Sequence, residues 1–308
     1  MLWRSLSQPS GQLKVVRFIP VTNDGEFKSG PMATDGLRIY FTETLPGQIR
    51  SLAQVSTSGG EVVRVPTSLG QPRLLDLTPN GTELLLGNQE ESEGANSLWI
   101  QPLVGGSPRR VGSALVNDAG WGPHGATVVY GDKDSVYLMN QDGTDPHKLL
   151  SQPGPPYSFS FSPDGQVLRF SLGSTASSSV MEISAHGTNP RELLPGCCGK
   201  WTPDGRYFIF QSEHEGRTDL WALPETGGFM PRKANSRPIQ LTAGPLEFHS
   251  PLSSKDGKEI FAIGHLRRAE IVRYDSRNRE FAPFFPSISA EGLSVLKGCG
   301  MDFLHLLS

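Results

Sequence analysis

Cysteine is scarce in this 308-residue sequence, and its three cysteines match neither a metal-binding nor a disulfide pattern. Cys197 and Cys198 are adjacent, and Cys299 lies near the end of the chain. A zinc site requires spaced pairs of Cys or His, and a disulfide framework requires an even set of separated cysteines. We interpret the adjacent pair as small residues packed in an inner strand, with a redox role as the alternative.

Long apolar runs and common catalytic motifs are missing as well. No window reaches 18 consecutive apolar residues, and the first residues lack the apolar core of a signal peptide. The sequence as written therefore predicts a cytoplasmic chain without a membrane span. It has no Gly-x-Ser-x-Gly elbow, no His-Glu-x-x-His motif and no Asp-x-Asp-x-Asp-Gly calcium loop. We predict no catalytic, cofactor-binding or metal-binding residues and no cofactor.

Charge is low and evenly spread. Charged residues make up 19% of the chain, the net charge is −3, and the nearest approach to a basic cluster is Arg267-Arg268. No nucleic-acid partner is therefore expected. The acidic stretches Glu90–Glu93 and Asp132–Asp134 are interpreted as charged loop tips. The stretch Glu213-His214-Glu215 is interpreted as a solvated hairpin loop, with a metal site as the less favoured alternative.

Glycine and proline, by contrast, are abundant at 35 and 25 residues, which is typical of a chain with many tight turns. A short turn motif ending in Gly recurs six times, with its glycines 40 to 52 residues apart. Asp and Asn tolerate the left-handed backbone of such turns, and Gly adopts a positive φ without strain. The six motifs are Thr34-Asp35-Gly36, Pro79-Asn80-Gly81, Pro123-His124-Gly125, Pro163-Asp164-Gly165, Pro203-Asp204-Gly205 and Lys255-Asp256-Gly257.

Each motif is followed by short runs rich in β-branched and aromatic residues, too short for globular helices. Four short strands in a repeat of about 40–45 residues are the pattern of a propeller blade. We predict an all-β fold, a β-propeller of four-stranded blades spanning 14–296. Its six complete blades are expected at 30–66, 72–112, 116–150, 156–195, 197–242 and 246–285. Tryptophans are expected to fill the gaps between blades, namely Trp99, Trp121, Trp201 and Trp221.

The repeat resembles the TolB-type, WD-like propeller family. The resemblance is carried by stretches such as WTPDGRYFIFQSEHEGRTDLWALPETGG (201–228) and FSPDGQVLRFSL (161–172), and it covers nearly the whole chain, 30–290. It implies a propeller fold. It does not imply one function, because these motif residues build turns and cores while function is carried by other residues of the fold.

The stretch VVRFIPVTNDGEFKSGPMATDGLRIYFTE (15–43) resembles the first blade of CadC-like membrane-anchored regulators. In that family a winged-helix DNA-binding domain and a membrane helix precede a periplasmic propeller that senses or binds. The resemblance implies a sensor module detached from its output domain. Propellers of this type also occur beside serine-peptidase domains of the prolyl-oligopeptidase kind, and no such domain follows here.

The two ends of the chain predict how the ring closes. Residues 1–13 are expected to be a disordered or linker segment, and 14–22 an outer closing strand. Residues 284–295 indicate a link to a seventh blade, but 297–308 lacks the next turn motif. We predict an incomplete seventh blade with an irregular, frame-shifted tail; a six-bladed ring with a short irregular tail is the alternative. Open strand edges in an unfinished blade predict marginal stability or aggregation.

These observations favour a non-catalytic protein-interaction or ligand-sensing propeller. It would bind a protein or a small ligand through loops at one ring face. One alternative is a propeller enzyme, or the gating propeller of a serine peptidase, with a site assembled at the central channel from residues of different blades. The other is a truncated, non-functional remnant.

Overall fold

A computed structural model describes residues 15, 17–89, 96–174, 177–225, 237–265, 272–275, 279–283, 292–297 and 302–307. In these residues the regular structure consists of β-strands and one 3-10 turn, η1 (Pro123–Gly125). No helix among them has the length and apolarity that a membrane crossing requires. The chain divides into two compact units, one formed by 1–243 with 248–263 and the other by 244–247 with 264–308.

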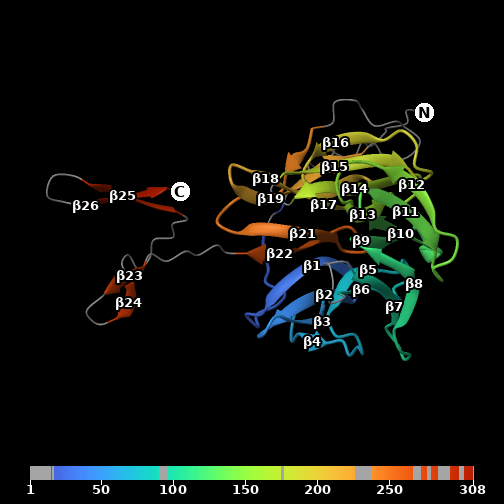
Figure 1. The fold of residues 1–308 in the computed structure, drawn as a ribbon, viewed down its shortest axis with the longest axis horizontal. Coiled ribbons are helices and arrows are strands. Elements are labelled where there is room, and N and C mark those ends of the chain that lie inside the picture. Colours follow the sequence, from blue (N-terminus) through green and yellow to red (C-terminus); the bar gives the residue numbers. More distant parts are fainter. Residues whose placement is uncertain are drawn as a thin grey trace, which may run out of the picture. The chain divides into compact units, whose positions relative to one another are not determined.

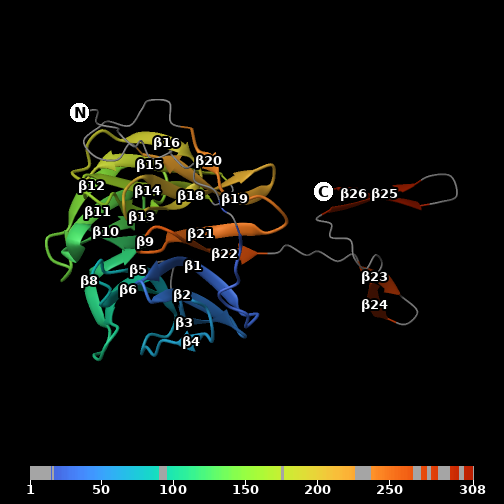
Figure 2. The same cartoon turned by 180° about the vertical axis from the view of Figure 1, so that it is seen from behind.

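The first unit contains five four-stranded antiparallel sheets, here called blades 1 to 5, in which strands consecutive in sequence are paired neighbours. Figures 1 and 2 show these blades arranged around a common centre. Blade 1 comprises β1 (Phe27–Thr34), β2 (Arg38–Leu45), β3 (Ile49–Ser56) and β4 (Val63–Arg64). Blade 2 comprises β5 (Pro72–Leu77), β6 (Glu83–Gln89), β7 (Asn96–Pro102) and β8 (Arg109–Val116). Blade 3 comprises β9 (Asp118–Trp121), β10 (Thr127–Asp132), β11 (Ser135–Asn140) and β12 (His147–Ser151). Blade 4 comprises β13 (Tyr157–Phe161), β14 (Val167–Ser174), β15 (Ser177–Ser184) and β16 (Arg191–Pro195). Blade 5 comprises β17 (Cys197–Trp201), β18 (Tyr207–His214), β19 (Arg217–Pro224) and β20 (Ile239–Gln240).

The prediction of six complete blades with an incomplete seventh is wrong, because the sixth repeat forms only a two-stranded sheet, β21 (Glu247–Ser253) with β22 (Ile260–His265). Phe261 and Ile263 of this hairpin pack in one apolar cluster with residues of blade 1. The hairpin therefore packs against blade 1, and a hydrogen bond from the Ser250 N–H to Gln211 joins it to blade 5. The turn motif at Gly257 connects the two strands of this hairpin. The outer strands of a blade form only when further segments pair with the edge of the hairpin, and β21–β22 has no such partner among the described residues.

In its described residues the second unit contains two separate hairpins. One pairs β23 (Val272–Asp275) with β24 (Glu280–Pro283), so the range 246–285 expected for blade 6 is divided between two sheets. The other pairs β25 (Gly292–Lys297) with β26 (Asp302–Leu307). The end of the chain, 297–308, thus contains a strand where an irregular tail was expected. In each hairpin the two strands pair only with each other.

The expected closing strand at 14–22 is not a strand in its described residues, 15 and 17–22. Pro20 interrupts the segment and has no N–H to donate to a sheet. The segment nevertheless lies on the ring: the Val21 carbonyl accepts a hydrogen bond from the Gly60 N–H at 3.3 Å, and the Phe18 ring stacks on Phe248 with centroids 4.9 Å apart. Residues 1–13 lie outside the described residues.

The hydrophobic core lies between blades. Each cluster of buried side chains combines residues of two consecutive sheets, as between blades 1 and 2, where Tyr40 and Leu52 meet Leu74, Leu84 and Leu86. A four-stranded sheet cannot bury both faces by itself, so radially packed sheets share their cores. The four tryptophans expected between blades lie in or against these clusters: Trp99, Trp121, Trp201 and Trp221.

The turn motifs obtain their geometry from the Asp side chain. In the motif of blade 4, the Asp164 Oδ1 accepts hydrogen bonds from the Ser162 hydroxyl at 2.6 Å and the Gln166 N–H at 3.1 Å, and Gly165 has a φ of +70°. These hydrogen bonds hold the pKa of Asp164 below its usual value. The third motif differs, because His124 itself has a φ of +64° and the segment forms η1.

Candidate functional site

The first strands of blades 1 to 5 lie at the centre of the ring, and each contacts the first strand of the next blade. These inner strands are irregular: register shifts interrupt the pairing of β1, β5, β13 and β17 with their second strands. Three residues there adopt a left-handed backbone, Ser158 (φ +55°), Cys198 (φ +60°) and Ser250 (φ +53°). Each of the three precedes the glycine of its turn motif by the same number of residues, so the irregularity belongs to the repeat. A bulge of this kind redirects backbone groups away from the ladder of the sheet.

Three of the redirected N–H groups donate to a polar side chain of the preceding blade. The Leu74 N–H donates to the Thr42 hydroxyl at 2.9 Å, which links blades 1 and 2. The Cys198 N–H donates to the Ser171 hydroxyl at 3.1 Å, which links blades 4 and 5. The Ser250 N–H donates to the Gln211 Oε1 at 2.7 Å, which links blade 5 to β21. The three acceptors Thr42, Ser171 and Gln211 occupy equivalent positions after their turn glycines.

Blades 2 and 3 carry glycine at that acceptor position, and aspartates on their inner strands accept N–H groups of the next blade: Asp118 accepts the equivalent N–H, and Asp76 accepts a different one. The Asp76 Oδ2 accepts from the Trp121 N–H of blade 3 at 3.0 Å. The Asp118 Oδ2 accepts from the Ser158 N–H of blade 4 at 2.7 Å. The other oxygen of each carboxylate accepts from the N–H of the following residue, at 3.0 Å for Asp76 and 3.1 Å for Asp118. Both carboxylates are therefore engaged by two backbone amides each.

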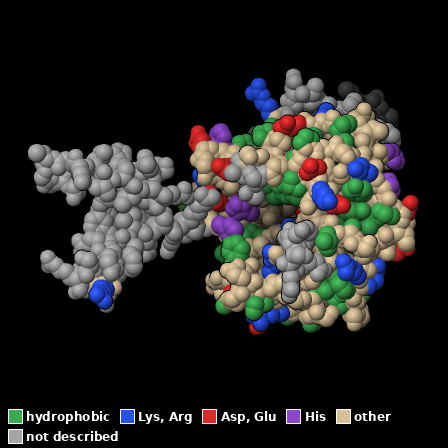
Figure 3. All heavy atoms as spheres, viewed as in Figure 1, with side chains coloured by type: hydrophobic (Ala, Val, Ile, Leu, Met, Phe, Trp, Pro, Cys, Tyr) green, Lys and Arg blue, Asp and Glu red, His purple; other side chains and the backbone are tan. Residues whose placement is uncertain are grey.

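Two basic side chains complete the charge balance of this central region. The Lys200 Nζ lies 3.6 Å from the Asp76 Oδ1 and donates to the Phe159 carbonyl at 3.4 Å. Blades 5 and 2 are opposite each other in a ring with six positions, so Lys200 bridges the centre. Arg73 lies 3.9 Å from the Asp118 carboxylate. Figure 3 shows a hollow at the middle of this face, with charges of both signs interspersed over the propeller rather than gathered into one patch.

This arrangement suits structural support better than acid–base chemistry. A general acid or base needs an oxygen within reach of a substrate. Here one oxygen of each carboxylate binds the next blade and the other binds its own backbone and faces a cation. Among the residues that the structure describes, no group of three or more His, Cys, Asp or Glu side chains is placed to hold a metal ion.

A second polar feature lies between blades 4 and 5, where the sequence indicated only a strand. Arg169 is 1% exposed, and its guanidinium binds the Glu182 carboxylate at 2.6 and 2.8 Å and Glu225 at 2.8 Å. The rings of Trp201 and Phe208 lie 4.1 and 4.6 Å from it. Burial raises the pKa of Glu182, but the guanidinium groups of Arg169 and Arg191 together outweigh burial, and the net pKa is lowered. The sequence signal for this buried ion pair is an arginine placed between two apolar residues of a strand, Leu168 and Phe170.

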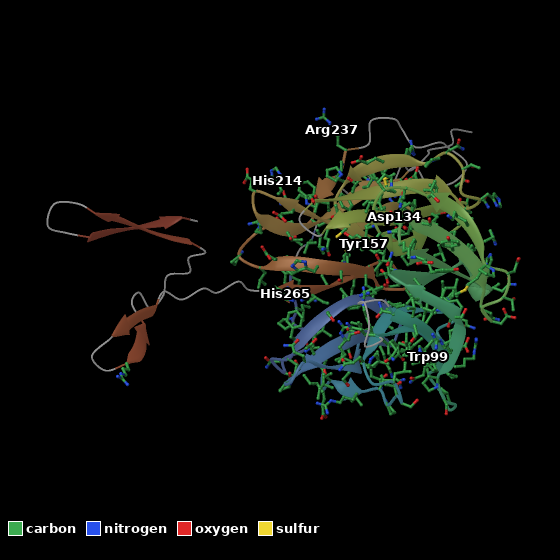
Figure 4. All side chains as sticks on the ribbon, in the orientation of Figure 1. Trp99, Asp134, Tyr157, His214, Arg237 and His265 are labelled. Carbon is green, nitrogen blue, oxygen red and sulfur yellow. The ribbon has the colours of Figure 1, made fainter. Side chains whose placement is uncertain are left out.

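The polar stretches considered from sequence are not brought together by the fold. His214 lies at the hairpin tip between β18 and β19 with its side chain 69% exposed, 3.8 Å from Glu215 (Figure 4). Asp132 and Asp134 flank the β10–β11 hairpin. Residues 90–95, 266–271 and 298–301 lie outside the described residues, so Glu90–Glu93, Arg267-Arg268 and Cys299 are not placed. Cys197 and Cys198 lie in inner strand β17.

A groove of about 690 Å³ lies on the outer part of blade 1. Glu43 in its wall is 3% exposed, and burial raises its pKa despite the nearby Lys28 amine, which pairs with both Glu43 and Asp24. Acidic side chains outnumber basic ones in the wall, so the groove would favour a cationic ligand. It is lined by Asn23, Asp24, Glu26, Glu43, Gly60, Glu61, Val62, Val63 and Arg64.

Comparison with known proteins supports the propeller fold. No protein-family model matches the chain. A protein of unassigned function from Agrobacterium fabrum is 25% identical over 145 residues, 44% of this chain and 49% of that protein, so the match spans about half the length of this relative. TolB of Acinetobacter baumannii superposes with a TM-score of 0.52 at 16% identity, covering 86% of this chain and 75% of TolB. The gluconolactonase XC5397 of Xanthomonas campestris superposes with a TM-score of 0.58 at 14% identity, covering 78% of this chain and 83% of the gluconolactonase.

The chain is thus an all-β propeller of four-stranded antiparallel blades with TolB among its structural neighbours. At 14 to 16% identity the likeness shows the fold alone. Its neighbours include TolB and an enzyme, so the fold does not decide between binding and catalysis.

Proposed function

We propose that this chain is a non-catalytic binding propeller that recognises a protein or a small ligand through loops at one ring face. The observation that supports the proposal is the engagement of Asp76 and Asp118. Propeller enzymes assemble their sites at the centre of the ring, and here the central carboxylates each accept two backbone N–H groups. Removing either carboxylate would therefore weaken the contact between blades.

The finer proposal is that the propeller is the sensory part of a membrane-anchored, CadC-like transcriptional regulator. It rests on the resemblance of 15–43 to the first blade of those regulators. The genomic DNA upstream of the coding sequence tests it. An in-frame winged helix followed by a membrane helix supports a sensor, and an upstream region that encodes neither contradicts it.

The alternative of a propeller enzyme is favoured by the likeness to gluconolactonase XC5397 and by the hollow at the middle of the ring. One experiment separates the two functions. The purified chain is incubated with gluconolactone and with other lactones, in turn with Mg²⁺, Ca²⁺, Mn²⁺ and Zn²⁺, and hydrolysis is followed by acid release. Binding without catalysis predicts a rate equal to that of buffer. A rate above buffer that Asp76→Asn or Asp118→Asn lowers at least tenfold, in a variant that unfolds cooperatively, overturns the proposal.

A ligand screen supplies the positive arm of the test. A ligand that binds the folded state alone raises the midpoint of thermal unfolding in proportion to the logarithm of its concentration. We expect at least one polar or cationic compound to raise the midpoint in this way. Substituting groove carboxylates (Asp24→Asn with Glu61→Gln) tests whether a cationic compound binds on blade 1, and Lys133→Ala with Asp134→Asn in the exposed β10–β11 turn provides the control.

A further inference from the structure

The two adjacent cysteines of blade 5 are in contact with each other. Both are free thiols, and their Sγ atoms lie 2.7 Å apart. Consecutive side chains of a regular strand point to opposite faces of the sheet. The left-handed backbone of Cys198 breaks that alternation, and the two sulfurs meet on one side.

The backbone around the pair is closely packed, so the sulfurs have little freedom to separate. A Cβ on Gly196 would lie 2.6 Å from the Gln211 carbonyl oxygen. A Cβ on Gly199 would lie 2.3 Å from the Phe208 ring. Glycine on both sides of the pair therefore allows the Gly-Cys-Cys-Gly segment to lie directly on β18, and the Cys198 N–H is tied to the Ser171 hydroxyl of blade 4.

The two thiols differ in exposure and in acidity. Cys197 is 1% exposed, whereas Cys198 is half-buried. The Cys198 thiol donates to the Cys197 sulfur, which lowers the pKa of Cys197, and Ser178, Tyr157 and Gln211 lower it further. The same interaction raises the pKa of Cys198. Tyr157 is near the centre of the ring in Figure 4. Cys198 is thus the more exposed residue of the pair, and Cys197 carries the more acidic thiol.

We propose that Cys197 and Cys198 form a dithiol site that small-molecule disulfides oxidise to a disulfide between the two adjacent residues. The Cys198 thiol loses its proton to solvent and attacks a disulfide RSSR as the thiolate, giving a mixed disulfide and RS⁻, which takes up a proton as RSH. The Cys197 thiolate then attacks the Cys198 sulfur, forming the new S–S bond and releasing the second RSH. Two thiols and RSSR become one protein disulfide and two RSH, so electrons and protons balance. The lowered pKa of Cys197 suits the second step, because the thiolate is the nucleophile in such exchange.

The geometry of the pair also predicts that the modification is reversible. The Cα atoms of consecutive residues are about 3.8 Å apart. Most protein disulfides join Cα atoms about 4.4–6.8 Å apart, and bonds outside that range are strained and more easily reduced. Metal chelation is less well supported, since no third His, Cys, Asp or Glu ligand accompanies the pair in the described part of the chain. This inference does not depend on the proposed binding function.

Peptide mass spectrometry after native oxidation tests the proposal. The folded full-length chain is incubated with oxidised glutathione, quenched in acid and digested with trypsin. Cleavage after Arg191 and Lys200 yields the peptide Glu192–Lys200, which contains both cysteines of the pair. We expect this peptide to lose the mass of two hydrogens and to retain no glutathione, and dithiothreitol to restore its mass.

Two matched variants separate the roles of the sulfurs. Cys197→Ser lacks the resolving sulfur, so its peptide should retain one glutathione on Cys198. Cys198→Ser lacks the sulfur of the more exposed residue, so its peptide should react at least tenfold more slowly than that of the wild type. Unfolding curves of both variants establish that they are folded before oxidation. A limiting amount of iodoacetamide on the wild type provides a test without substitutions, because it should label Cys198 in preference to Cys197.

Four results would overturn the proposal. They are a wild-type peptide that retains glutathione, a wild-type pair that reacts only after denaturation, preferential labelling of Cys197, and a cross-linked peptide that joins the pair to Cys299.

Discussion

The junctions between blades are of two kinds, and their difference indicates what the central residues do. Neutral side chains of the second strand link blades 1–2, 4–5 and 5–β21, whereas carboxylates of the inner strand link blades 2–3 and 3–4. The carboxylates occur where the neutral acceptor position is glycine, Gly87 or Gly131. Asp118 thus replaces a missing structural acceptor and Asp76 accepts another backbone N–H of the next blade, so the presence of acidic residues at the centre of this propeller is not by itself a sign of catalysis.

The largest effect is expected where charge is most deeply buried, at the junction of blades 4 and 5. Arg169→Leu would leave Glu225 and part of Glu182 buried without their cation, and breaking such a pair typically destabilises a protein by about 3–5 kcal/mol. Urea unfolding at constant pH measures the loss. Arg206→Leu, with a side chain 61% exposed, is the control and should change stability by no more than about 0.5 kcal/mol. Equal effects of the two substitutions would mean that the buried pair does not join these blades.

The next prediction compares the two kinds of junction directly. Asp118→Ala removes a charged acceptor from the Ser158 N–H and leaves Arg73 without its carboxylate, which should reduce the free energy of unfolding by about 2–3 kcal/mol. Thr42→Val removes a neutral acceptor of the same shape from the Leu74 N–H and should reduce it by about 1 kcal/mol. Asp118→Asn keeps an acceptor oxygen, so its free energy of unfolding should lie between those of the wild type and Asp118→Ala. A larger loss for Thr42→Val than for Asp118→Ala would reverse the proposed ranking.

The glycines explain why the two kinds of junction differ. A Cβ on Gly131 would lie 2.5 Å from the carbonyl oxygen of Pro156, the residue before blade 4, whereas the nearest atom to a Cβ on Gly87 would be in the Asn96 side chain at 3.1 Å. Gly131→Ala should therefore destabilise by about 1–3 kcal/mol, and Gly87→Ala by less than about 1 kcal/mol. Thermal or urea unfolding of the pair measures both. If Gly131→Ala is neutral, close approach of the backbones is not the reason for glycine at this junction.

The smallest effect concerns the turns outside the junctions. The lowered pKa of Asp164 means that the unfolded chain takes up this proton at a higher pH than the folded chain does. The stability contribution is therefore complete above the unfolded pKa near 3.9 and is lost as pH falls through the folded pKa. Because the turn is exposed, we expect the ionised Asp164 to contribute about 0.5 kcal/mol or less to the free energy of unfolding. When the free energy of unfolding is measured in urea at pH 7 and at pH 3, its decrease at pH 3 should be smaller for Asp164→Asn than for the wild type. An equal decrease would contradict this prediction.

Local signals in the sequence were enough to predict the turns, the four-stranded blades and the packing of aromatic residues between sheets. Asp164 and Gly165 illustrate why: their turn depends on residues adjacent in sequence. The role of Asp118 depends on a bulge that brings the Ser158 N–H from the next blade, and no local pattern encodes that contact. Alignment of the repeats offered one clue, since Gly87 and Gly131 stand where other repeats have Thr42, Ser171 and Gln211.

The sixth repeat shows a second limit of prediction from sequence. Asp256-Gly257 marks its hairpin correctly, but the recruitment of outer strands depends on pairing between segments that are distant in the fold. Arg169 shows a third limit. Its alternation with Leu168 and Phe170 indicates a strand, while its acidic partners come from β15 and from the residue after β19, at distances that only the packed structure defines.

Amide hydrogen exchange of Ser158 and Trp121 tests most directly whether the central carboxylates hold the blades together. Both N–H groups donate to a carboxylate of the preceding blade, so both should exchange slowly in the wild type. Asp118→Ala should accelerate exchange at Ser158 selectively, and Asp76→Ala should do so at Trp121. Fast exchange at both amides in the wild type would contradict the account, because it would show that Asp76 and Asp118 are free for other chemistry.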